Sequence, residues 1–409
     1  MPHGRDPTNP GLTESEATSA VLGRVFREEA GALAAALVRT LGDFDLAEEL
    51  VQDAFVAATA RWPSEGLPRR PGAWLLTVAR NRALDILRRD ARYQHKLSLL
   101  QHPIQREPDD RLRLIFTCCH PALAREAQVA LTLRTVCGFS VAQIARAFLS
   151  SEPTIAQRLV RARRKIAEAG IPYRVPSDED LDERLGEVLT VLYLVFNEGY
   201  LASSGDESQA LDLATDAVWL AELLSKLLPD EPEVLGLLAL MRLHRARVAA
   251  RFDAGGGLVM LRDQDRTRWD HAAIASAGEL LASAARLHKP GQYQLQAAIV
   301  ACHAESPSWE ATDWPQILAL YDHLLASAAS PVARLNRAIA ARYVDGPAAA
   351  LGEVDALAPT LGQYRLFHAT RAELLRDLGR PAEARQADAQ ALALTSNPAE
   401  RRLLEQRLE

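Results

Sequence analysis

Residues 138–166 of the 409-residue chain read GFSVAQIARAFLSSEPTIAQRLVRARRKI. Apolar residues recur at helical spacing on both sides of a short polar break, which predicts two helices joined by a tight turn. Ser140 and Gln143 have the spacing of a capping box, and Ser151 is a suitable N-cap for the second helix. Pro153 is tolerated because it falls in the first helical turn. The stretch therefore predicts a helix-turn-helix.

The second of these helices is expected to have an apolar face and a basic face. Its apolar stripe consists of Ile155, Leu159, Ala162 and Ile166. Polar and basic side chains cap its start or project outward, namely Ser151, Thr154, Gln157, Arg158, Arg161, Arg164 and Lys165. Residues 153–167 contain five basic side chains and no acid. Gln and Arg read base edges in a major groove, and Arg and Lys bind phosphates, so we expect a DNA recognition helix. The alternative is a basic surface helix in an ordinary bundle.

The rest of the chain shows the same helical spacing, and no convincing strand emerges from it. The sequence therefore predicts an all-α fold, divided by Pro-containing breaks. The expected parts are a helical bundle at 18–93, a linker at 94–110, the helix-turn-helix unit at 111–170, a linker at 171–180 and a helical extension at 181–409.

The extension contains a weak internal repeat. Residues 331–360 and 363–399 each read as a helix, a Gly-centred turn and a second Ala-rich helix. The turn glycines, Gly346 and Gly379, are 33 residues apart, which suits tetratricopeptide-like hairpins of ~34 residues. Stacked hairpins bury a continuous apolar stripe and leave a concave surface, where an unknown protein partner is possible. The alternative is an irregular α-helical bundle.

The formal net charge of −6 is distributed unevenly along the chain. Residues 1–175 carry 25 Lys and Arg against 19 Asp and Glu, whereas residues 176–409 carry 22 against 34. A basic half joined to an acidic half is typical of a nucleic-acid-binding part linked to a different module. The composition, 48% hydrophobic and 24% charged, excludes a disordered, collagen-like or coiled-coil protein.

Several features of the sequence indicate the compartment. The longest apolar run, near residues 188–196, is far shorter than the ~18 residues of a membrane helix. Residues 1–11 lack the apolar core of a signal peptide. Four cysteines are too few for a disulfide framework in so long a chain. We therefore expect a cytoplasmic protein with no membrane partner.

An acidic helix is expected near the N-terminus. No Lys or Arg occurs between Arg39 and Arg61. Within this stretch an apolar stripe is formed by Leu46, Leu50, Val51, Ala54 and Phe55. The opposite face carries Asp45, Glu48, Glu49, Gln52 and Asp53. The face is either a docking surface for a basic partner or a solvated surface, and charge alone does not decide between them.

A further helix, at residues 71–89, is expected to place a tryptophan among polar side chains. Placed at 100° per residue, one side is apolar, and the other side carries Trp74, Asn81, Arg82, Asp85, Arg88 and Arg89. The preceding segment, expected to be a loop over residues 62–70, adds Trp62, Arg69 and Arg70. Aromatic rings stack on unpaired bases and Arg neutralises phosphates, so these residues suit melted DNA. The alternative is that Trp74 packs on a neighbouring helix and the arginines only increase solubility.

The order of these parts resembles bacterial RNA polymerase sigma factors of the extracytoplasmic-function (ECF) type. The matching motifs are DLAEELVQDAF at 45–55, WL at 74–75 with VARNRALD at 78–85, and GFS at 138–140 with IA at 144–145 and RL at 158–159. Together they cover about residues 18–170.

The resemblance implies a role for each part. The acidic helix would dock on the clamp helices of the polymerase β′ subunit. Residues 62–70 and the helix at 71–89 would open and read the −10 promoter element. The helix-turn-helix would read the −35 element and touch the β flap. Such a protein is a promoter-specificity subunit, not an enzyme, and its partners are core RNA polymerase and promoter DNA.

The remainder of the chain is similar to the ECF subgroup that has a tetratricopeptide-like C-terminal extension. The similar stretches are DDRLRLIFTCCHP at 109–121, FNEGY at 196–200, and DAGGG at 253–257 followed by QDR at 264–266 and Trp269. The resemblance implies that no membrane anti-sigma factor is needed and that the extension supports or controls activity in cis. A control motif would comprise Asp253, Gly255, Gly256, Gly257, Gln264, Asp265, Arg266 and Trp269. The alternative for this motif is a salt-bridged loop that closes the extension.

Two short motifs suggest bound ions, but their context argues against it. Cys118, Cys119 and His120 are consecutive, and no second Cys/His pair lies at zinc spacing, so we expect buried packing there and no metal. Gly255–Gly257 is followed by no Lys-Ser/Thr pair and preceded by no strand, unlike a phosphate-binding loop. We expect no cofactor.

Two other functions remain open from the sequence. A stand-alone helix-turn-helix regulator with a sensory helical-repeat domain would bind duplex DNA without polymerase. An enzyme with its active site around residues 253–270 would bind a small molecule there. The regulator hypothesis leaves the acidic helix and Trp74 unexplained.

Overall fold

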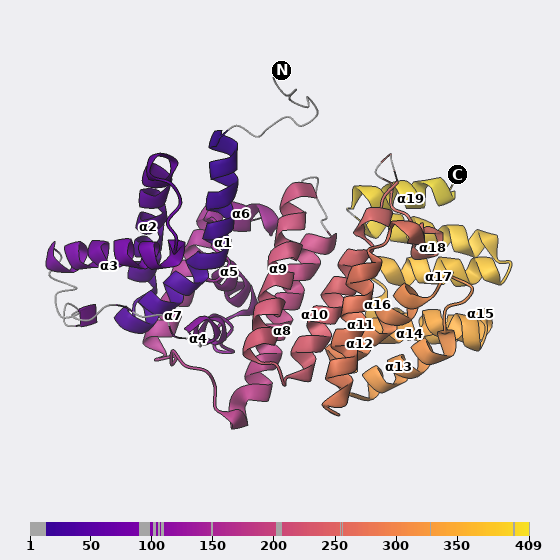
Figure 1. The fold of residues 1–409 in the computed structure, drawn as a ribbon. Helices are drawn as coiled ribbons and strands as arrows, with labels where there is room; N and C mark the ends of the chain where they lie inside the picture. The colour runs from indigo at the N-terminus through magenta and orange to yellow at the C-terminus, as the bar shows by residue number, and fades with distance from the viewer. Residues whose placement is uncertain are drawn as a thin grey trace, which may run out of the picture. The chain divides into compact units, whose positions relative to one another are not determined.

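The computed structural model describes residues 14–89, 99–100, 104, 107, 110–148, 150–201, 207–253, 255, 257–327, 329–395 and 397–408. Within these residues the regular structure is helical, with one isolated β-bridge between Phe252 and Leu258 (Figure 1). The all-α prediction is confirmed. Most of the expected linker 94–110 lies outside the described residues. The chain divides into two compact units, Met1–Val191 and Leu192–Glu409.

The first unit contains two groups of helices. They are α1 (Glu14–Leu41), α2 (Phe44–Glu65) and α3 (Pro71–Arg89), then α4 (Asp110–Cys118), α5 (Arg125–Thr135), α6 (Val141–Ala147) and α7 (Glu152–Glu168). In the first group, α1 packs on α2 and α3, and α2 packs on α3; α4 also packs on α1, and α5 on α7. Leu33, Leu50 and Leu75 of the first group and Phe116 of the second are fully buried.

The helix-turn-helix forms as the sequence predicts. The Ser140 backbone N–H donates to the Gln143 side chain (2.8 Å), and the Gln143 N–H donates back to Ser140 Oγ (3.1 Å). Ser151 Oγ caps α7 by accepting from the Thr154 N–H at 3.3 Å. The predicted apolar stripe of α7 is the buried face of that helix: Ile155, Leu159, Ala162 and Ile166. These bonds close both helix starts and fix the turn between them.

The segment around Trp62 differs from the prediction. It was expected in a loop over residues 62–70, but α2 continues to Glu65 and ends at Gly66, whose φ is +82°. The Trp62 side chain is only 4% exposed, and its ring meets the edge of Trp74 at 5.4 Å between centroids. Burial of this large ring against α3 stabilises the extra helical turn, so the true loop is only residues 66–70.

The helix α8 (Asp178–Leu201) contains the division between the two units, at Val191 and Leu192. The sequence placed the start of the extension at residue 181, which is eleven residues before Leu192 and inside the same helix. The second unit continues with α9 (Glu207–Leu227), α10 (Pro232–Ala246), three short 3-10 turns η2 (Val248–Ala250), η3 (Leu261–Asp263) and η4 (Arg266–Arg268), α11 (His271–Arg286), α12 (Gln292–Glu305) and α13 (Trp314–Ser327).

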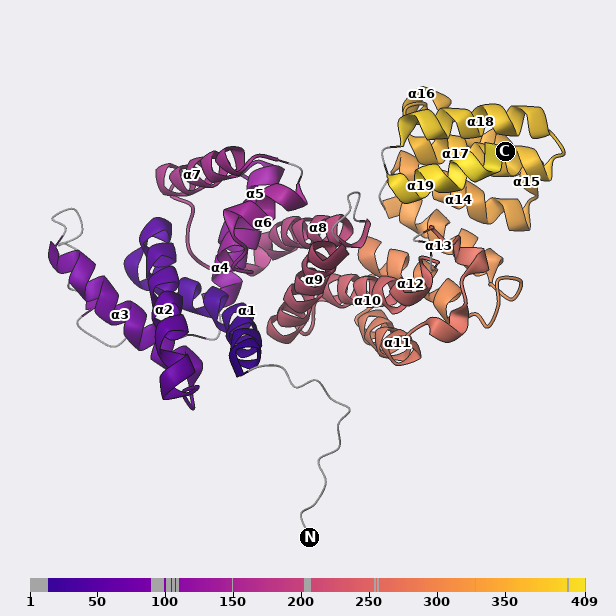
Figure 2. The same ribbon diagram turned by 90° about the horizontal axis from the view of Figure 1, so that it is seen from above.

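The predicted repeats are observed as two helical hairpins at the end of the second unit (Figure 2). The first is α14 (Pro331–Val344) with α15 (Pro347–Asp355) and the short α16 (Ala358–Leu361); the second is α17 (Arg365–Asp377) with α18 (Pro381–Leu394). Their turns contain Gly346 and Gly379 at φ +92° and +68°, a conformation that favours glycine. The last helix, α19 (Pro398–Leu408), packs on α18. No helix among the described residues is long and apolar enough to cross a membrane.

Candidate functional site

The polar side chains of the acidic face of α2 differ in how far they are exposed. Asp45, Glu49 and Gln52 are exposed, whereas Glu48 and Asp53 are partly buried. The helix starts at Asp43, whose carboxylate accepts from the Leu46 N–H at 3.0 Å, so the first acids lie at its positive end. Val56 continues the exposed face one turn further and is 66% exposed. The sequence analysis did not single out this apolar residue.

Glu48 is bound by two arginines of the helix-turn-helix unit. Arg134 of α5 donates from Nε to Glu48 at 2.5 Å, and Arg163 of α7 forms an ion pair with the other carboxylate oxygen. Arg163 also contacts Asp45 at 2.7 Å, and Gln52 donates to Glu48 at 3.1 Å. The expected docking face therefore contacts α5 and α7 within the first unit.

The sequence analysis missed both arginines. Arg163 follows Ala162 of the apolar stripe directly, and its side chain is only 13% exposed. A basic residue at the border of a buried stripe is a signal for an inward-facing ion pair. The sequence does not identify the partner, because Glu48 is 115 residues away.

The residues expected to meet the −10 element lie mainly on the open side of α3. Of the expected residues on α3, those that are exposed are Asn81, Arg82, Asp85, Arg88 and Arg89, as are Arg69 and Arg70 of the preceding loop. Arg82 donates from Nε to the Asp53 carboxylate of α2 at 2.6 Å, and this hydrogen bond raises the pKa of Arg82. Trp74 is half-buried against Trp62. The two rings therefore lie in contact at the border of this surface, and neither projects freely into solvent.

The residues expected to meet the −35 element share one open face of α7. Ser151, Thr154, Gln157, Arg161, Arg164 and Lys165 are exposed, and Arg158 is half-buried. Arg164 is paired within the helix to Glu168 at 3.4 Å. Val160 lies among these side chains and is 60% exposed, although the sequence analysis left it out. An apolar group beside Gln and Arg is suited to contact a thymine methyl.

The stretch at 109–121 supplies buried packing. Cys118 and Cys119 are fully buried, as expected, and burial raises the pKa of Cys119 to about 12. Asp110 is also buried and accepts from Arg39 Nε of α1 at 2.7 Å. Tyr173, after α7, donates its hydroxyl to the carbonyl oxygens of Ala35 and Asp110, at 2.8 and 3.1 Å. These contacts join α1 and α4 to the segment that follows α7.

The glycine motif of the extension folds around one carboxylate. Asp253 Oδ1 accepts from the backbone N–H groups of Gly255 (2.8 Å) and Gly257 (2.7 Å). A Cβ at Gly257 would lie 2.6 Å from Asp253 Oδ2, so only glycine permits this close approach. Gly256 lies outside the described residues.

The rest of the motif holds its loop to α12. Asp265 accepts from the Thr267 N–H at 3.0 Å, and the bonds from Thr267 lower the pKa of Asp265. Arg266 donates to the carbonyls of His303 and Ser306, at 2.6 and 2.7 Å. The Arg266 guanidinium also lies 4.6 Å from the ring centre of Trp269, which is buried.

Gln264 donates to the Val259 carbonyl at 3.2 Å, and Asp270 caps α11 by accepting from the Ala273 N–H at 2.9 Å. Two aspartates of the motif, Asp253 and Asp265, and the adjacent Asp270 thus accept from backbone N–H groups. These short carboxylates accept from N–H groups of their own segment, whereas Asp263 pairs with Arg262 at 3.5 Å.

The comparison with protein-family models finds three matches. Residues 25–93 match Sigma-70 region 2, residues 113–166 match Sigma-70 region 4, and residues 184–285 match a family of unknown function, DUF6596. The first two matches cover α2–α3 and the helix-turn-helix. No solved structure matches the chain.

Two relatives are similar over different parts of the chain. The uncharacterized protein R00370 of Rhizobium meliloti (strain 1021) is 45% identical over 388 residues, which cover 91% of this chain and 92% of that protein. The ECF RNA polymerase sigma factor SigL of Mycobacterium tuberculosis is 32% identical over 167 residues, which cover 38% of this chain and 94% of SigL. With both sigma regions matched, and with a sigma factor aligned over nearly its whole length, the chain belongs to the ECF RNA polymerase sigma factors.

Proposed function

We propose that this sigma factor binds core RNA polymerase through the open acidic face of α2 and reads the two promoter elements with α3 and α7. One observation carries the proposal: a single compact unit presents an exposed acidic face and two exposed basic faces on three different helices. Separate faces of opposite charge suit one protein partner and one nucleic acid. The β′ clamp and the β flap are the proposed polymerase contacts, and the repeats of the extension are a further surface for an unknown protein.

The two basic faces would recognise different promoter elements. On α7, Gln157, Arg158 and Arg161 would read base edges of the −35 element, while Arg164 and Lys165 would bind phosphates. On α3, Asn81 and Asp85 would read the −10 element together with the loop at 66–70, with Arg88 and Arg89 on the backbone. The buried position of Trp62 restricts base stacking to the accessible side of Trp74.

Docking on polymerase would compete with contacts inside the first unit. Glu48 and Asp45 are engaged by Arg163, and Glu48 also by Arg134. A basic surface on polymerase that takes over these carboxylates frees Arg163 and releases α7 from α2. Docking would then separate the two promoter-reading helices as far as promoter spacing requires.

The extension would act in cis on this initiation step. In the described residues of its motif, Asp253, Asp265 and Asp270 accept hydrogen bonds from backbone N–H groups, and these bonds support a defined surface. We propose that this surface tunes the activity of the promoter-reading unit.

Run-off transcription with purified core polymerase and the full-length chain tests the proposal, on promoters mapped by sequencing transcripts after overexpression. Glu49 is exposed and forms none of the ion pairs described above, so Glu49→Arg changes the docking face without breaking Glu48 contacts. We expect Glu49→Arg to weaken core binding roughly 10-fold or more, because it sets like charges against each other.

Glu183→Arg, at an exposed position of α8, is the matched control and should bind core polymerase like the wild type. Wild-type transcription by Glu49→Arg would exclude docking through α2. Duplex binding by the wild type without any promoter-dependent product would favour the stand-alone regulator instead.

A further inference from the structure

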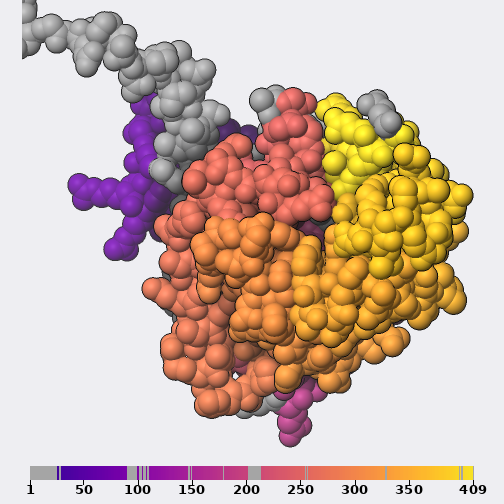
Figure 3. All heavy atoms as spheres, turned by 90° about the vertical axis from the view of Figure 1, so that its right-hand side faces the viewer, coloured from indigo at the N-terminus to yellow at the C-terminus, as the bar shows by residue number. Residues whose placement is uncertain are grey.

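The second unit contains a cavity of about 270 Å³ bordered by segments far apart in sequence. Leu258, Met260 and Leu261 come from the loop after the glycine motif. Trp309 and Tyr343 supply aromatic walls, with ring centres 5.8 Å apart, and α17 and α19 complete the lining. Figure 3 shows this side of the molecule hollowed where the salmon, orange and yellow segments meet. The size suits a small molecule rather than a folded partner.

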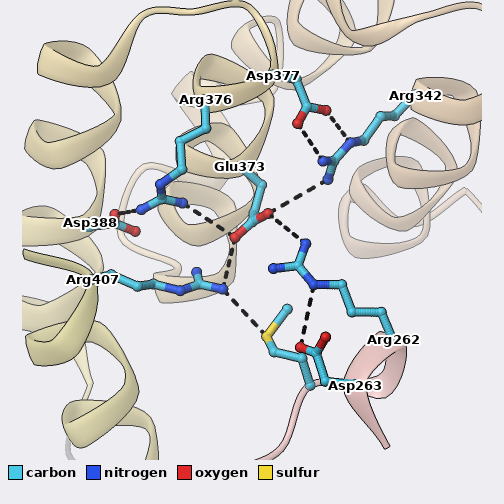
Figure 4. Close-up of polar contacts among 9 residues, drawn as sticks. Arg262, Asp263, Arg342, Glu373, Arg376, Asp377, Asp388 and Arg407 are labelled. Atoms are coloured by element: carbon cyan, nitrogen blue, oxygen red, sulfur yellow. Dashed lines mark hydrogen bonds and ion pairs between the residues drawn. The ribbon is translucent and has the colours of Figure 1, made fainter.

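The charged groups of the lining are mainly basic. Four arginines line the cavity, Arg262, Arg342, Arg365 and Arg407, against two glutamates, Glu373 and Glu400. Arg365 forms a bidentate ion pair with Glu400, in which its guanidinium donates two hydrogen bonds to the carboxylate at 2.5 and 2.8 Å. The remaining three guanidinium groups share the single carboxylate of Glu373 within the cavity (Figure 4).

The Glu373 carboxylate has fewer acceptor sites than the surrounding arginines have N–H donors. Its two oxygens meet Arg407 at 2.8 Å, Arg262 and Arg376 at 3.3 Å, and Arg342 at 3.8 Å. Only the first of these is a short ion pair. Each guanidinium carries five N–H donors, and two carboxylate oxygens offer about four acceptor sites.

Two of the arginines that share Glu373 also have a carboxylate of their own. Arg342 also holds Asp377, and Arg376 also holds Asp388. Arg262 reaches Asp263 only at 3.5 Å, and Arg407 extends its second contact to the sulfur of Met260 at 3.5 Å. Arg262 and Arg407 are therefore the two groups best placed to take a second anion.

The cavity is also connected to the glycine motif. Arg402 of α19 donates to the Gly255 carbonyl at 3.3 Å, and Arg407 of the same helix contacts Met260. The loop from Asp253 to Asp263 is thus held between its own carboxylate and the arginines of α19. A molecule that binds Arg407 bears directly on the position of this loop.

We propose that the cavity binds a small amphipathic anion, with its apolar body against Trp309, Tyr343 and Leu258 and its carboxylate on Arg262 and Arg407. The apolar lining favours a hydrocarbon or aromatic body, and the lining itself, with four arginines against two glutamates, favours a negative end. The site goes beyond the proposed function, since it assigns a ligand class to the extension, and its test needs no polymerase.

Isothermal titration calorimetry of the full-length chain with octanoate, octanol and octylammonium tests the proposal, because the three share one apolar body and differ in charge. We expect octanoate to bind in preference to both others. Arg407→Gln should weaken octanoate binding about 10-fold or more and change octanol binding little, because it removes a hydrogen bond to a charged group. Arg371→Gln is the matched control: Arg371 lies on α17, pairs with Asp355 at 2.7 Å and does not line the cavity.

A second pair of variants tests the location. Ala369→Trp fills the cavity and should abolish octanoate binding, whereas Ala382→Trp, at an exposed position of α18, should leave it unchanged. Thermal unfolding followed by circular dichroism shows whether each variant is folded. Absence of octanoate binding to the wild type, equal binding of octanol and octanoate, or octanoate binding that survives Ala369→Trp would each overturn the proposal.

Discussion

At the residue scale, Gly138 shows how one position fixes the start of the helix-turn-helix. Its φ is +79°, which L side chains rarely adopt, and a Cβ there would lie 2.4 Å from the Phe26 ring. Phe26 in turn packs edge-on against Phe55 of α2, with ring centres 4.6 Å apart. A side chain at position 138 would therefore have an unfavourable backbone conformation and would also clash with the packed ring of Phe26.

We expect Gly138→Ala to lower the free energy of unfolding by roughly 2–4 kcal/mol, from the left-handed backbone and the forced shift of Phe26. Urea unfolding followed by circular dichroism measures the change. Gly186→Ala is the control, because Gly186 lies inside α8 with no atom within 4 Å of its Cβ position. That helical substitution should be neutral or stabilising by up to about 1 kcal/mol, and equal losses in the two variants would contradict the prediction.

Two partly buried histidines, His244 and His303, make the extension sensitive to acid. Burial and the nearby guanidinium groups of Arg247 and Arg251 lower the pKa of His244 from 6.5 to about 3. Burial, Arg247 and Arg266 lower the pKa of His303 to about 4. The unfolded chain therefore binds more protons below pH 6.5, so stability is complete above that pH and is lost as the pH falls toward these values.

Lowering the pH from 7 to 5 should cost about 2 kcal/mol of unfolding free energy for each of these histidines. His244 Nδ1 faces Arg247 Nη2 at 3.1 Å, so His244→Gln keeps an acceptor for the guanidinium but does not titrate. We expect this variant to lose less stability between pH 7 and pH 5, measured by urea unfolding at both values. His288→Asn changes an exposed histidine and should keep the wild-type pH dependence; an unchanged dependence in His244→Gln would refute the assignment.

At the scale of elements, the contact between α2 and α7 is the feature with the largest consequence for function. Arg163 of α7 holds Asp45 and Glu48 of α2, and Arg134 of α5 adds to the contact. The side chains of Arg163 and Glu48 are 13% and 20% exposed, so water screens this pair only in part. The proposed docking carboxylates therefore stabilise the free arrangement of the unit as well.

We expect Arg163→Ala to weaken the contact of α7 with α2 by about 1 kcal/mol, which corresponds to roughly 5-fold tighter binding of core polymerase. Fluorescence anisotropy of the labelled chain, titrated with core polymerase in the absence of DNA, measures the change. Arg164→Ala alters an exposed neighbour paired only locally with Glu168, and it serves as the control. Weaker binding by Arg163→Ala would mean that Arg163 assists docking rather than competes with it.

At the scale of the whole molecule, the boundary between the two units indicates where the chain should be truncated to obtain a stable first unit. The first unit extends to Val191, and the first half of α8 contacts it. Arg184 donates to the Phe116 carbonyl at 2.6 Å, and Glu187 pairs with Arg125 at 2.7 Å. A truncation at the expected linker removes both contacts, although it keeps every helix of the sigma regions.

We expect a chain of residues 1–177 to be about 2 kcal/mol less stable than a chain of residues 1–191, from the loss of two partly buried hydrogen-bonded contacts. Thermal and urea unfolding of the two truncated chains measure the difference. Arg184→Gln within residues 1–191 should reproduce part of the loss. Equal stability of the two truncated chains would show that the start of α8 adds nothing to the first unit.

The sequence by itself determined the local features of this protein. The capping box at Ser140, the N-cap at Ser151, the buried stripe of α7 and the turns at Gly346 and Gly379 all depend on side chains a few residues apart. Helical periodicity and capping chemistry encode such features directly, so the all-α fold and the two outward basic faces could be predicted.

Only the tertiary structure decided which side chains are free and which are engaged. Glu48 meets Arg134 and Arg163 across 86 and 115 residues, and Arg262 meets Glu373 across 111. Trp62 is buried because α3 covers it, which no local pattern indicates. Periodicity shows which face of a helix is buried, but the partner of a charged group depends on how helices pack, and this packing joins parts of the chain that share no local pattern.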